Sequence, residues 1–286
     1  MNPRPGPRAS GILARLAAIA IVTLFAATAA PALTSPDAPP PLAGIAHVAI
    51  RVHDLAASTA FYQKLGYDQP FALDRNGQVN EAFVKINDTQ FIELYPTTAK
   101  NPGPSFLHLC FEGVDLQIIH DDYITRGLTP RGPVRKAGAG NLLFTMNGPQ
   151  QPFGPQNIEY TQYQPGSRHY EDRGKNLGPN RVADKLLIVA LAMQDPAAAR
   201  DFYVNQLEFK PVTGSLTLLH LPGDSGEQVE IVPAATLGNR ARLTLQTESL
   251  SHTEHLLHKQ HIAFTKTEGA LTLLDPDGNI IRIVAR

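Results

Sequence analysis

Four side chains of metal-binding type lie in the first half of the chain, each inside a short run of mostly uncharged residues. They are His47 in IAHVAIRV, Glu93 in QFIELYP, His108 in FLHLCFE and Glu159 in NIEYTQY. Residues alternate between the two faces of a strand, so each His or Glu shares its face with mostly uncharged neighbours. A carboxylate buried alone in such a setting is costly, and buried charges are usually paired or bound to metal.

Each of these residues also has an ordinary structural explanation. A lone strand histidine is often a hydrogen-bonded core residue, and a lone strand glutamate can face water. The joint pattern is the stronger signal, because histidine and glutamate alternate twice along successive strands. Two imidazoles and two carboxylates suit a borderline divalent cation such as Ni, Co, Mn, Fe or Zn. We therefore predict one divalent metal ion bound by these four residues.

Composition narrows the other possibilities. The 286 residues carry a formal net charge of −1, so no basic surface points to a nucleic acid partner. A hydrophobic content of 43% with 18% charged residues is that of a globular protein able to bury a core. The single cysteine, Cys110, excludes a disulfide framework and thiolate-rich zinc sites. Any metal site must therefore use histidines and carboxylates.

The elements that must position these residues follow the order β-α-β-β-β. Ile45–Val52 is rich in β-branched residues and predicts a strand. Asp54 is typical of a helix N-cap, Leu55–Leu65 has helical spacing of its apolar residues, and Gly66 ends the helix. Three further strands are expected at Gln69–Leu73, Glu81–Ile86 and Gln90–Tyr95.

The same order then occurs three more times. The second unit is expected to contain a helix over Asp115–Thr125 and strands over Ser105–Phe111, Thr129–Arg131, Asn141–Met146 and Asn157–Tyr163. The third begins with a strand over Lys185–Met193 and a helix opened by Asp195 and a proline. Asp54 and Asp195 are each followed seven residues later by a Phe-Tyr pair. The remaining expected elements are strands at Gln228–Val232, Arg242–Thr247 and Ile280–Val284 and a helix over Ser251–Lys259. Four units in two pairs indicate a fold built by repetition.

Four such units, with the turn DPDGN at 275–279 leading into the last strand, resemble the vicinal oxygen chelate superfamily. That group includes glyoxalase I, methylmalonyl-CoA epimerase, extradiol dioxygenases and bleomycin resistance proteins. The resemblance covers nearly all of the chain from Gly44 to Arg286. It implies a glyoxalase-like α+β fold, in which each pair of βαβββ units makes one curved mixed β-sheet module with the site on its concave face. It also implies that the order His-Glu-His-Glu marks four metal positions, and that adjacent substrate oxygens take two more.

The leading functional interpretation is a metal-dependent lyase, isomerase or epimerase that moves a proton next to the carbonyl of a small carbonyl or hydroxy-carbonyl substrate. Glu93 or Glu159 would act as general base, because a ligand carboxylate is ionised and lies close to the substrate carbon. One alternative is an extradiol ring-cleaving dioxygenase, which usually needs two histidines and one glutamate. Another is a non-catalytic small-molecule binding protein of the bleomycin resistance type, which generally lacks the metal set.

The second half of the chain lacks the ligand set. Aligning the repeats puts Ile188, Glu230, Arg242 and Arg282 at the positions of the four ligands, in that order. Isoleucine and arginine cannot be ligands here, since neither offers a lone pair. We therefore expect one site inside the first half, without exchange of units between the halves. The second half is expected to be a structural partner, and binding of an anion by its two arginines is the alternative.

The first residues have the features of an export signal. Three arginines precede or flank a short apolar run over residues 16–25, and small-residue cleavage sites follow it. The run is shorter than the roughly 20 residues that a membrane span needs. We therefore expect an exported protein, periplasmic or secreted, without a stable membrane span after signal removal; an uncleaved anchor is the alternative. The predicted division is a signal peptide over 1–32, a flexible leader over 33–43, a metal-binding module over 44–163, a linker over 164–183 and a degenerate module over 184–286.

Overall fold

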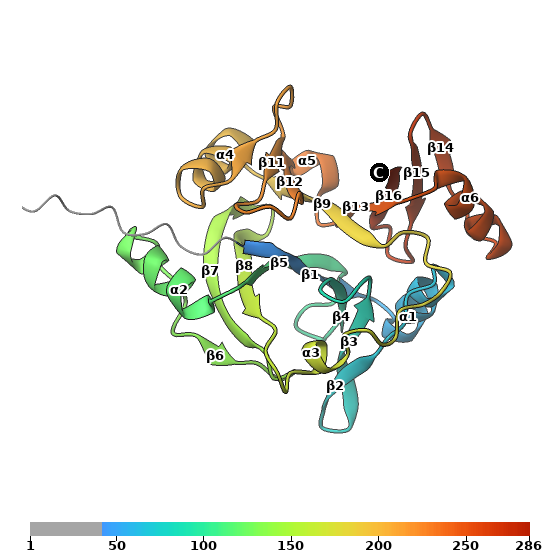
Figure 1. Cartoon of the computed structure of the whole chain (residues 1–286), viewed down its shortest axis with the longest axis horizontal. Helices are drawn as coiled ribbons and strands as arrows, with labels where there is room; N and C mark the ends of the chain where they lie inside the picture. Colours follow the sequence, from blue (N-terminus) through green and yellow to red (C-terminus); the bar gives the residue numbers. More distant parts are fainter. Residues whose placement is uncertain (1–41) are drawn as a thin grey trace, which may run out of the picture. The chain divides into compact units, whose positions relative to one another are not determined.

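The computed structural model describes residues 42–286, which form two eight-stranded sheets, one from each half of the chain (Figure 1). The predicted signal peptide and all but the last two residues of the predicted leader lie outside this described part. Within it, no helix is both long and apolar enough to cross a membrane. The predicted α+β fold of two curved mixed sheets is confirmed.

The first sheet is built from the first half of the chain. From edge to edge its strands are β2 (Phe71–Arg75), β3 (Gln78–Lys85), β4 (Phe91–Pro96), β1 (Leu42–Val52), β5 (Ser105–Gly113), β8 (Gly154–Gln162), β7 (Leu142–Gln151) and β6 (Arg135–Lys136). β1 pairs in parallel with β4, and β5 pairs in parallel with β8. The four strands that carry the candidate ligands are therefore neighbours in the middle of one sheet. No described strand of the second half enters it, as expected for an arrangement without unit exchange.

The second sheet repeats this order with strands of the second half. Its strands are β10 (Lys210–Pro211), β11 (Leu218–His220), β12 (Gln228–Pro233), β9 (Lys185–Met193), β13 (Arg242–Thr247), β16 (Ile280–Ala285), β15 (Ala270–Leu274) and β14 (Thr265–Thr267). The parallel pairs are again the first strand of a unit with its last, β9 with β12 and β13 with β16. The sequence repeat is therefore also a structural repeat.

Helices follow the first strand of each unit. They are α1 (Leu55–Lys64), α2 (Leu116–Thr125), α4 (Pro196–Asn205) and α6 (Leu250–Lys259), with the one-turn helices α3 (Arg168–Glu171) and α5 (Ala234–Leu237) in addition. The four longer helices begin alike, because an N-cap side chain accepts the backbone N–H three residues later. These caps are Asp54, Asp115, Asp195 and Ser249.

The tyrosine of each Phe-Tyr pair explains why that pair recurs. Tyr62 on α1 is fully buried and donates its hydroxyl to Asp275 Oδ2 in the second half, at 3.2 Å. Tyr203 on α4 is also fully buried and donates to Gln156 Oε1 in the first half, at 3.0 Å. Each module therefore places a buried hydrogen-bond donor in the other, which supports a structural role for the second module.

One predicted strand is displaced. Thr129–Arg131 forms a single bridge, between Pro130 and Met146, and pairing with β7 continues at β6. Proline has no backbone N–H to donate to a ladder, which accounts for the break. The short elements β10, β11, β14, β15, α3 and α5 are additional to the expected set, because runs of two to five residues carry little periodicity.

The segment predicted as a linker, 164–183, is folded against the first module. It contains α3, which is drawn beside β3 in Figure 1. His169 and Asp172 in this segment are buried, and Lys85 Nζ on β3 donates to Asp172 Oδ2 at 2.8 Å. The segment thus belongs to the wall of the first module as well as joining the two halves.

Candidate metal centre

The four candidate ligands come from the four central strands of the first sheet, His47 from β1, Glu93 from β4, His108 from β5 and Glu159 from β8. The strand register brings them to one face. Ala49, two residues after His47, is the partner of both Glu93 and His108 in the ladder. Register partners and i, i+2 neighbours share a face, so these side chains project to the same side of the sheet.

Ring nitrogens and carboxylate oxygens converge between these strands. His47 Nε2 lies 3.1 Å from His108 Nε2 and 3.3 Å from Glu159 Oε1, while His47 Nδ1 lies 3.2 Å from Glu93 Oε1. His108 Nε2 lies 4.0 Å from Glu93 Oε2 and 3.9 Å from Glu159 Oε2. The structure therefore brings together all four residues singled out from the sequence.

Burial leaves this cluster short of positive charge. His47, Glu93 and His108 are 1%, 4% and 8% exposed. Burial lowers the pKa of His47 to about 3 and that of His108 to about 4, so both rings are neutral at pH 7. Burial, followed by the negative charges of Glu81 and Glu159, raises the pKa of Glu93 well above its usual range. The carboxylates are therefore not compensated by the histidines.

A divalent cation fits this donor set. Ligand atoms roughly 2.0–2.2 Å from one ion lie about 3 Å apart when adjacent and about 4 Å apart when opposite. The measured separations run from 3.1 Å to 4.0 Å. In addition, His47 Nδ1 is buried and has no hydrogen-bond partner among residues 42–286. Neutral imidazoles and carboxylates are the donors that divalent first-row metals accept.

Cys110 lies close to the same cluster but is a poorer donor. Its sulfur is within 4.8 Å of ligand atoms of His47 and Glu159. Burial, followed by the charge of Glu159, raises the pKa of the Cys110 thiol. Metals bind the thiolate rather than the thiol, so the two histidines and two glutamates remain the better set.

Glu81 on β3 is a fifth acidic residue beside the cluster, which the sequence pattern did not single out. Tyr95 donates its hydroxyl to Glu81 Oε1 at 2.7 Å, and the same hydroxyl lies 3.2 Å from Glu93 Oε2. Burial raises the pKa of Glu81. The available signal was the alternation on β3, since Phe83 is the ladder partner of Glu93 and Glu81 is two residues before it.

A cavity of about 200 Å³ opens on the candidate metal centre. Its acidic wall contains Glu81, Glu93 and Glu159, and Tyr95 lies beside them. The polar side chains of its other walls are Arg135, Asn141 and His169. The cavity thus joins the central strands of the sheet to the start of β7 and to the segment that had been predicted as a linker.

The corresponding positions of the second sheet hold an ion pair instead. Ala190 is the ladder partner of both Glu230 and Arg242, as Ala49 is of two ligands in the first sheet. The alignment made from the sequence is therefore confirmed by the register. Arg242 Nη2 lies 2.8 Å from Glu230 Oε2, and Arg282 is exposed. Because Glu230 already compensates Arg242, the structural role is favoured over anion binding.

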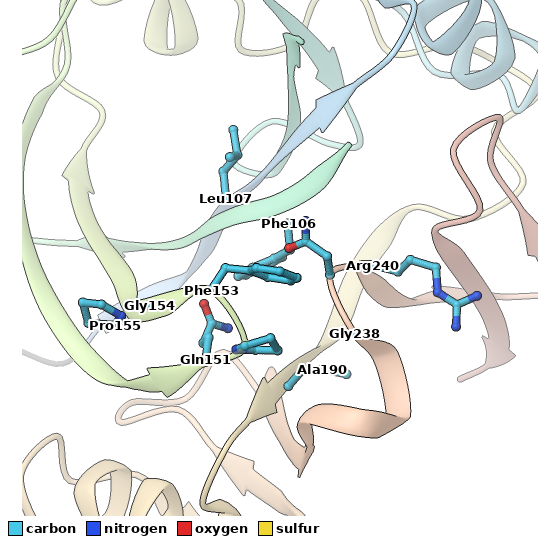
Figure 2. A pocket seen from close by; sticks show the side chains of 12 residues that line it. Phe106, Leu107, Gln151, Phe153, Gly154, Pro155, Ala190, Gly238 and Arg240 are labelled. Atoms are coloured by element: carbon cyan, nitrogen blue, oxygen red, sulfur yellow. The ribbon is translucent and has the colours of Figure 1, made fainter. Parts of the chain in front are cut away.

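A separate cavity of about 120 Å³ lies where the β7–β8 hairpin faces the second sheet (Figure 2). Its walls include Phe106, Gln151 and Phe153 of the first half and Ala190, Gly238 and Arg240 of the second. It contains none of the four candidate ligands, and Arg240 is the one ionisable residue of its walls. We therefore place the chemistry in the cavity over the candidate metal centre.

Comparison with known families gives one match. Residues 44–156 match the model described as the Glyoxalase/Bleomycin resistance protein/Dioxygenase superfamily. This range contains His47, Glu93 and His108 and ends three residues before Glu159. Comparison with curated proteins finds no match.

Several solved structures share the fold. A Mn(II)-bound glyoxalase from Novosphingobium aromaticivorans is 14% identical with a TM-score of 0.63, over 86% of this chain and 82% of that one. An extradiol ring-cleaving dioxygenase from B. fuscum is 17% identical with a TM-score of 0.61, over 88% and 74%. The 2,3-dioxygenase LapB from Pseudomonas sp. KL28 is 14% identical with a TM-score of 0.61, over 87% and 94%. At these identities the likeness concerns the fold.

Proposed function

Because its first module belongs to the Glyoxalase/Bleomycin resistance protein/Dioxygenase superfamily, we propose that this chain is a divalent-metal-dependent lyase, isomerase or epimerase of glyoxalase type. The match also confirms the vicinal oxygen chelate resemblance noted from the sequence. The observation that carries the proposal is the convergence of two buried histidines and two glutamates on one face of the sheet. Mn²⁺ is the first cation to test, since the similar glyoxalase binds Mn(II).

The chemistry follows from the donor set and from the carboxylates around it. His47, Glu93, His108 and Glu159 would hold the cation, which when bound polarises adjacent substrate oxygens and stabilises negative charge on them. A carboxylate then takes a proton from the carbon next to the carbonyl, and the bonding electrons stay on the substrate. The proton returns to the neighbouring carbon in an isomerase or to the opposite face in an epimerase, so no oxidant is needed.

Three carboxylates are candidates for the base. Glu93 and Glu159 are the two predicted from the sequence, and both would also bind the cation. Glu81 lies in the same cavity, is held by the Tyr95 hydroxyl and has no place among the ligands. A carboxylate without a bound cation keeps its lone pairs available, which makes Glu81 the strongest candidate of the three.

The size of the cavity limits the substrate. A volume of about 200 Å³ is below the roughly 300–1,000 Å³ usual for pockets of drug-sized ligands. This supports a substrate of a few carbon atoms rather than a large thiol conjugate. The export predicted from the first residues points the same way, because the usual thiol cosubstrate of glyoxalases is cytosolic.

Proton exchange in heavy water tests the proposed reaction directly. Mn²⁺-loaded protein is incubated with small 2-oxoaldehydes and 2-hydroxy ketones, and loss of the carbon-bound proton next to the carbonyl is followed by NMR. We expect exchange above the buffer rate for at least one compound, and its loss in His47→Ala. Glu230→Ala is the matched control, since Glu230 has the position of Glu93 in the second sheet. Absence of exchange with every compound would contradict a proton-transfer enzyme.

The ring-cleaving dioxygenase is the second candidate, favoured by the similar folds of two dioxygenases. It is weaker here because a fourth protein donor, Glu93, lies within reach of both histidines. Oxygen consumption by Fe²⁺-loaded protein with catechols separates the two. Uptake of oxygen without proton exchange would favour ring cleavage.

A further inference from the structure

His169 is a buried side chain in the cavity to which the proposed reaction gives no role. It is 1% exposed, and within the part of the chain that the structure describes neither ring nitrogen has a hydrogen-bond partner. Buried polar groups nearly always have a partner, because an unpaired one costs free energy. The ring lines the cavity over the candidate metal centre. Its missing partner is therefore expected to come from the cavity.

Aromatic rings hold His169 in one orientation. It stacks on Tyr163 with ring centroids 4.3 Å apart and an interplanar angle of 14°. Its edge-to-face contacts are with Phe71, Phe83 and Phe91. Burial lowers the pKa of His169 well below its ordinary value, so the ring is neutral at pH 7. One nitrogen then donates and the other accepts.

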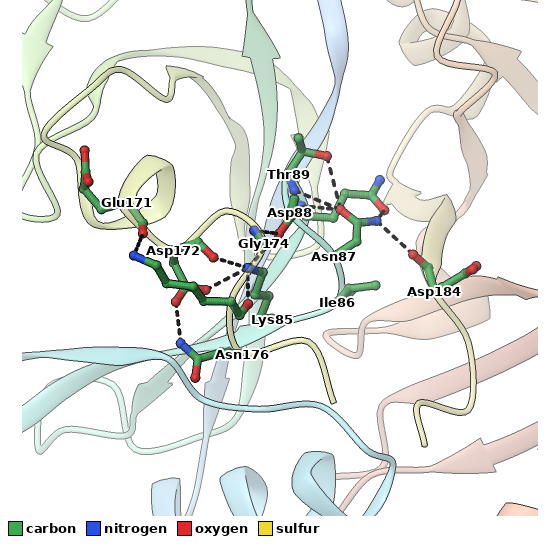
Figure 3. A network of polar contacts seen from close by, with 12 residues as sticks. Lys85, Ile86, Asn87, Asp88, Thr89, Glu171, Asp172, Gly174, Asn176 and Asp184 are labelled. Atoms are coloured by element: carbon green, nitrogen blue, oxygen red, sulfur yellow. Dashed lines mark hydrogen bonds and ion pairs between the residues drawn. The ribbon is translucent and has the colours of Figure 1, made fainter. Parts of the chain in front are cut away.

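The segment that carries His169 is fixed by a buried lysine (Figure 3). Lys85 Nζ on β3 donates to Asp172 Oδ2 at 2.8 Å and to the backbone carbonyls of Asp172 and Lys175 at 2.6 Å and 2.7 Å. Asp88 Oδ1 lies 2.9 Å from the same ammonium and accepts the backbone N–H of Gly174 at 2.8 Å. These contacts hold residues 172–175 against β3, directly after α3. A residue that contacts substrate requires such rigid support.

Asn141 provides a second unpartnered group in the same cavity. It is 3% exposed, and its Nδ2 donates to Thr161 Oγ1 at 2.6 Å. Its Oδ1 is buried without a partner in the range 42–286. A carbonyl oxygen can only accept, so the group that satisfies Asn141 must be a donor.

We propose that His169 and Asn141 form a substrate-recognition wall that binds hydroxyl groups of the substrate. This inference rests on the proposed metal-dependent function and narrows its substrate class to small hydroxy-carbonyl compounds. A hydroxyl can donate to Asn141 Oδ1 and can accept from the His169 N–H. An apolar substrate end would leave both side chains unpaired.

Two small hydroxamates that differ by one hydroxyl test this wall. Acetohydroxamate and glycolohydroxamate present the same pair of chelating oxygens, so the ratio of their affinities cancels the contribution of the metal. Each is titrated into Co²⁺-loaded full-length protein and followed by visible absorption. We expect wild type to prefer glycolohydroxamate by about tenfold, the value of one hydrogen bond. The ratio should fall to about one in His169→Phe, which keeps an aromatic ring without nitrogen.

Three further variants make the outcome specific. His169→Gln keeps an amide donor and should restore part of the ratio, and Asn141→Leu tests the wall independently. His120→Phe is the matched control, since His120 is buried but both its ring nitrogens have partners. A ratio near one in wild type, or an unchanged ratio in both His169→Phe and Asn141→Leu, overturns the recognition wall alone. Failure of wild type to bind Co²⁺ overturns the proposed function, and this inference with it.

Discussion

Glu81, Tyr95 and Glu93 form a hydrogen-bonded group at the acidic wall of the cavity, and their chemistry separates ligand from base. One phenol hydroxyl has one proton, so Tyr95 donates fully to one carboxylate at a time, and its shorter contact is to Glu81. Burial, followed by the charges of both glutamates, raises the pKa of Tyr95, so it stays protonated. Tyr95 is therefore positioned to hold Glu81 in place without competing for a proton.

Replacing Glu81 tests the assignment of the base. Glu81→Gln keeps the size of the side chain and removes its basicity. Because Glu81 is not among the ligands, we expect unchanged metal content with kcat lower by roughly 10²-fold or more, the usual scale for a general base. Glu93→Gln and Glu159→Gln should weaken metal binding as well. Full turnover in Glu81→Gln would return the role to one of the two ligand glutamates.

The ligand set could be predicted from sequence because it depends on elements that the sequence specifies strongly. Long strands with β-branched residues and a repeated Asp-to-Phe-Tyr spacing fix the register, and register fixes which residues share a face. Glu81 could be found only with the partner strand in hand. His169 could not, because its role depends on a turn-rich segment folding back over the sheet, and such segments have no periodicity to interpret.

At the scale of elements, Glu227 is the polar link between the start of β12 and the first module. Its Oε2 accepts the backbone N–H of Ile45 on β1, and its Oε1 accepts from Gln90 Nε2 at 2.9 Å. Burial raises the pKa of Glu227 to about 7, against the opposing effects of Ile45 and Lys185. A raised pKa means that the folded state favours the protonated acid.

Stability should therefore depend on pH through Glu227. Its contribution is fully present below the unfolded-state pKa, and it is lost as pH rises toward about 7. We expect Glu227→Gln to become more stable relative to wild type by roughly 2–3 kcal/mol between pH 5 and pH 8, measured by urea unfolding. The exposed Glu268→Gln serves as control. A difference that does not change with pH would contradict this account.

Gly66 shows how tightly the segment before β9 is packed on α1. Its φ is +87°, and a Cβ there would lie 2.3 Å from the backbone oxygen of Asn180. We expect Gly66→Ala to lower the free energy of unfolding by roughly 2–4 kcal/mol, through both left-handed strain and overpacking. Gly77→Ala is the matched control, because Gly77 has φ +76° but open space around it. Equal losses in the two variants would show that residues 178–182 are not packed on α1 in solution.

At the scale of the whole molecule, the two modules divide the work. The first carries the donor set and the cavity, while the second has an ion pair between Glu230 and Arg242 at the matching positions. Reciprocal buried hydrogen bonds from Tyr62 and Tyr203 join them. A duplicated fold can thus keep one functional sheet and use the other as its structural partner.

Export remains a prediction from the first residues. We expect a mature N-terminus near Pro31 or Leu33 and recovery of the protein from the periplasm or medium. Mass spectrometry of the exported fraction measures this. Intact Met1 in a membrane fraction would instead support the uncleaved anchor.

The measurement that tests the central claim most directly is the metal content of purified protein, determined per chain by elemental mass spectrometry. The account predicts one divalent ion per chain in wild type and in Glu230→Ala. It predicts almost none in His47→Ala or His108→Ala, with both variants still folded by circular dichroism. Retention of the ion in either histidine variant, or its loss in Glu230→Ala, would contradict a single metal centre inside the first module.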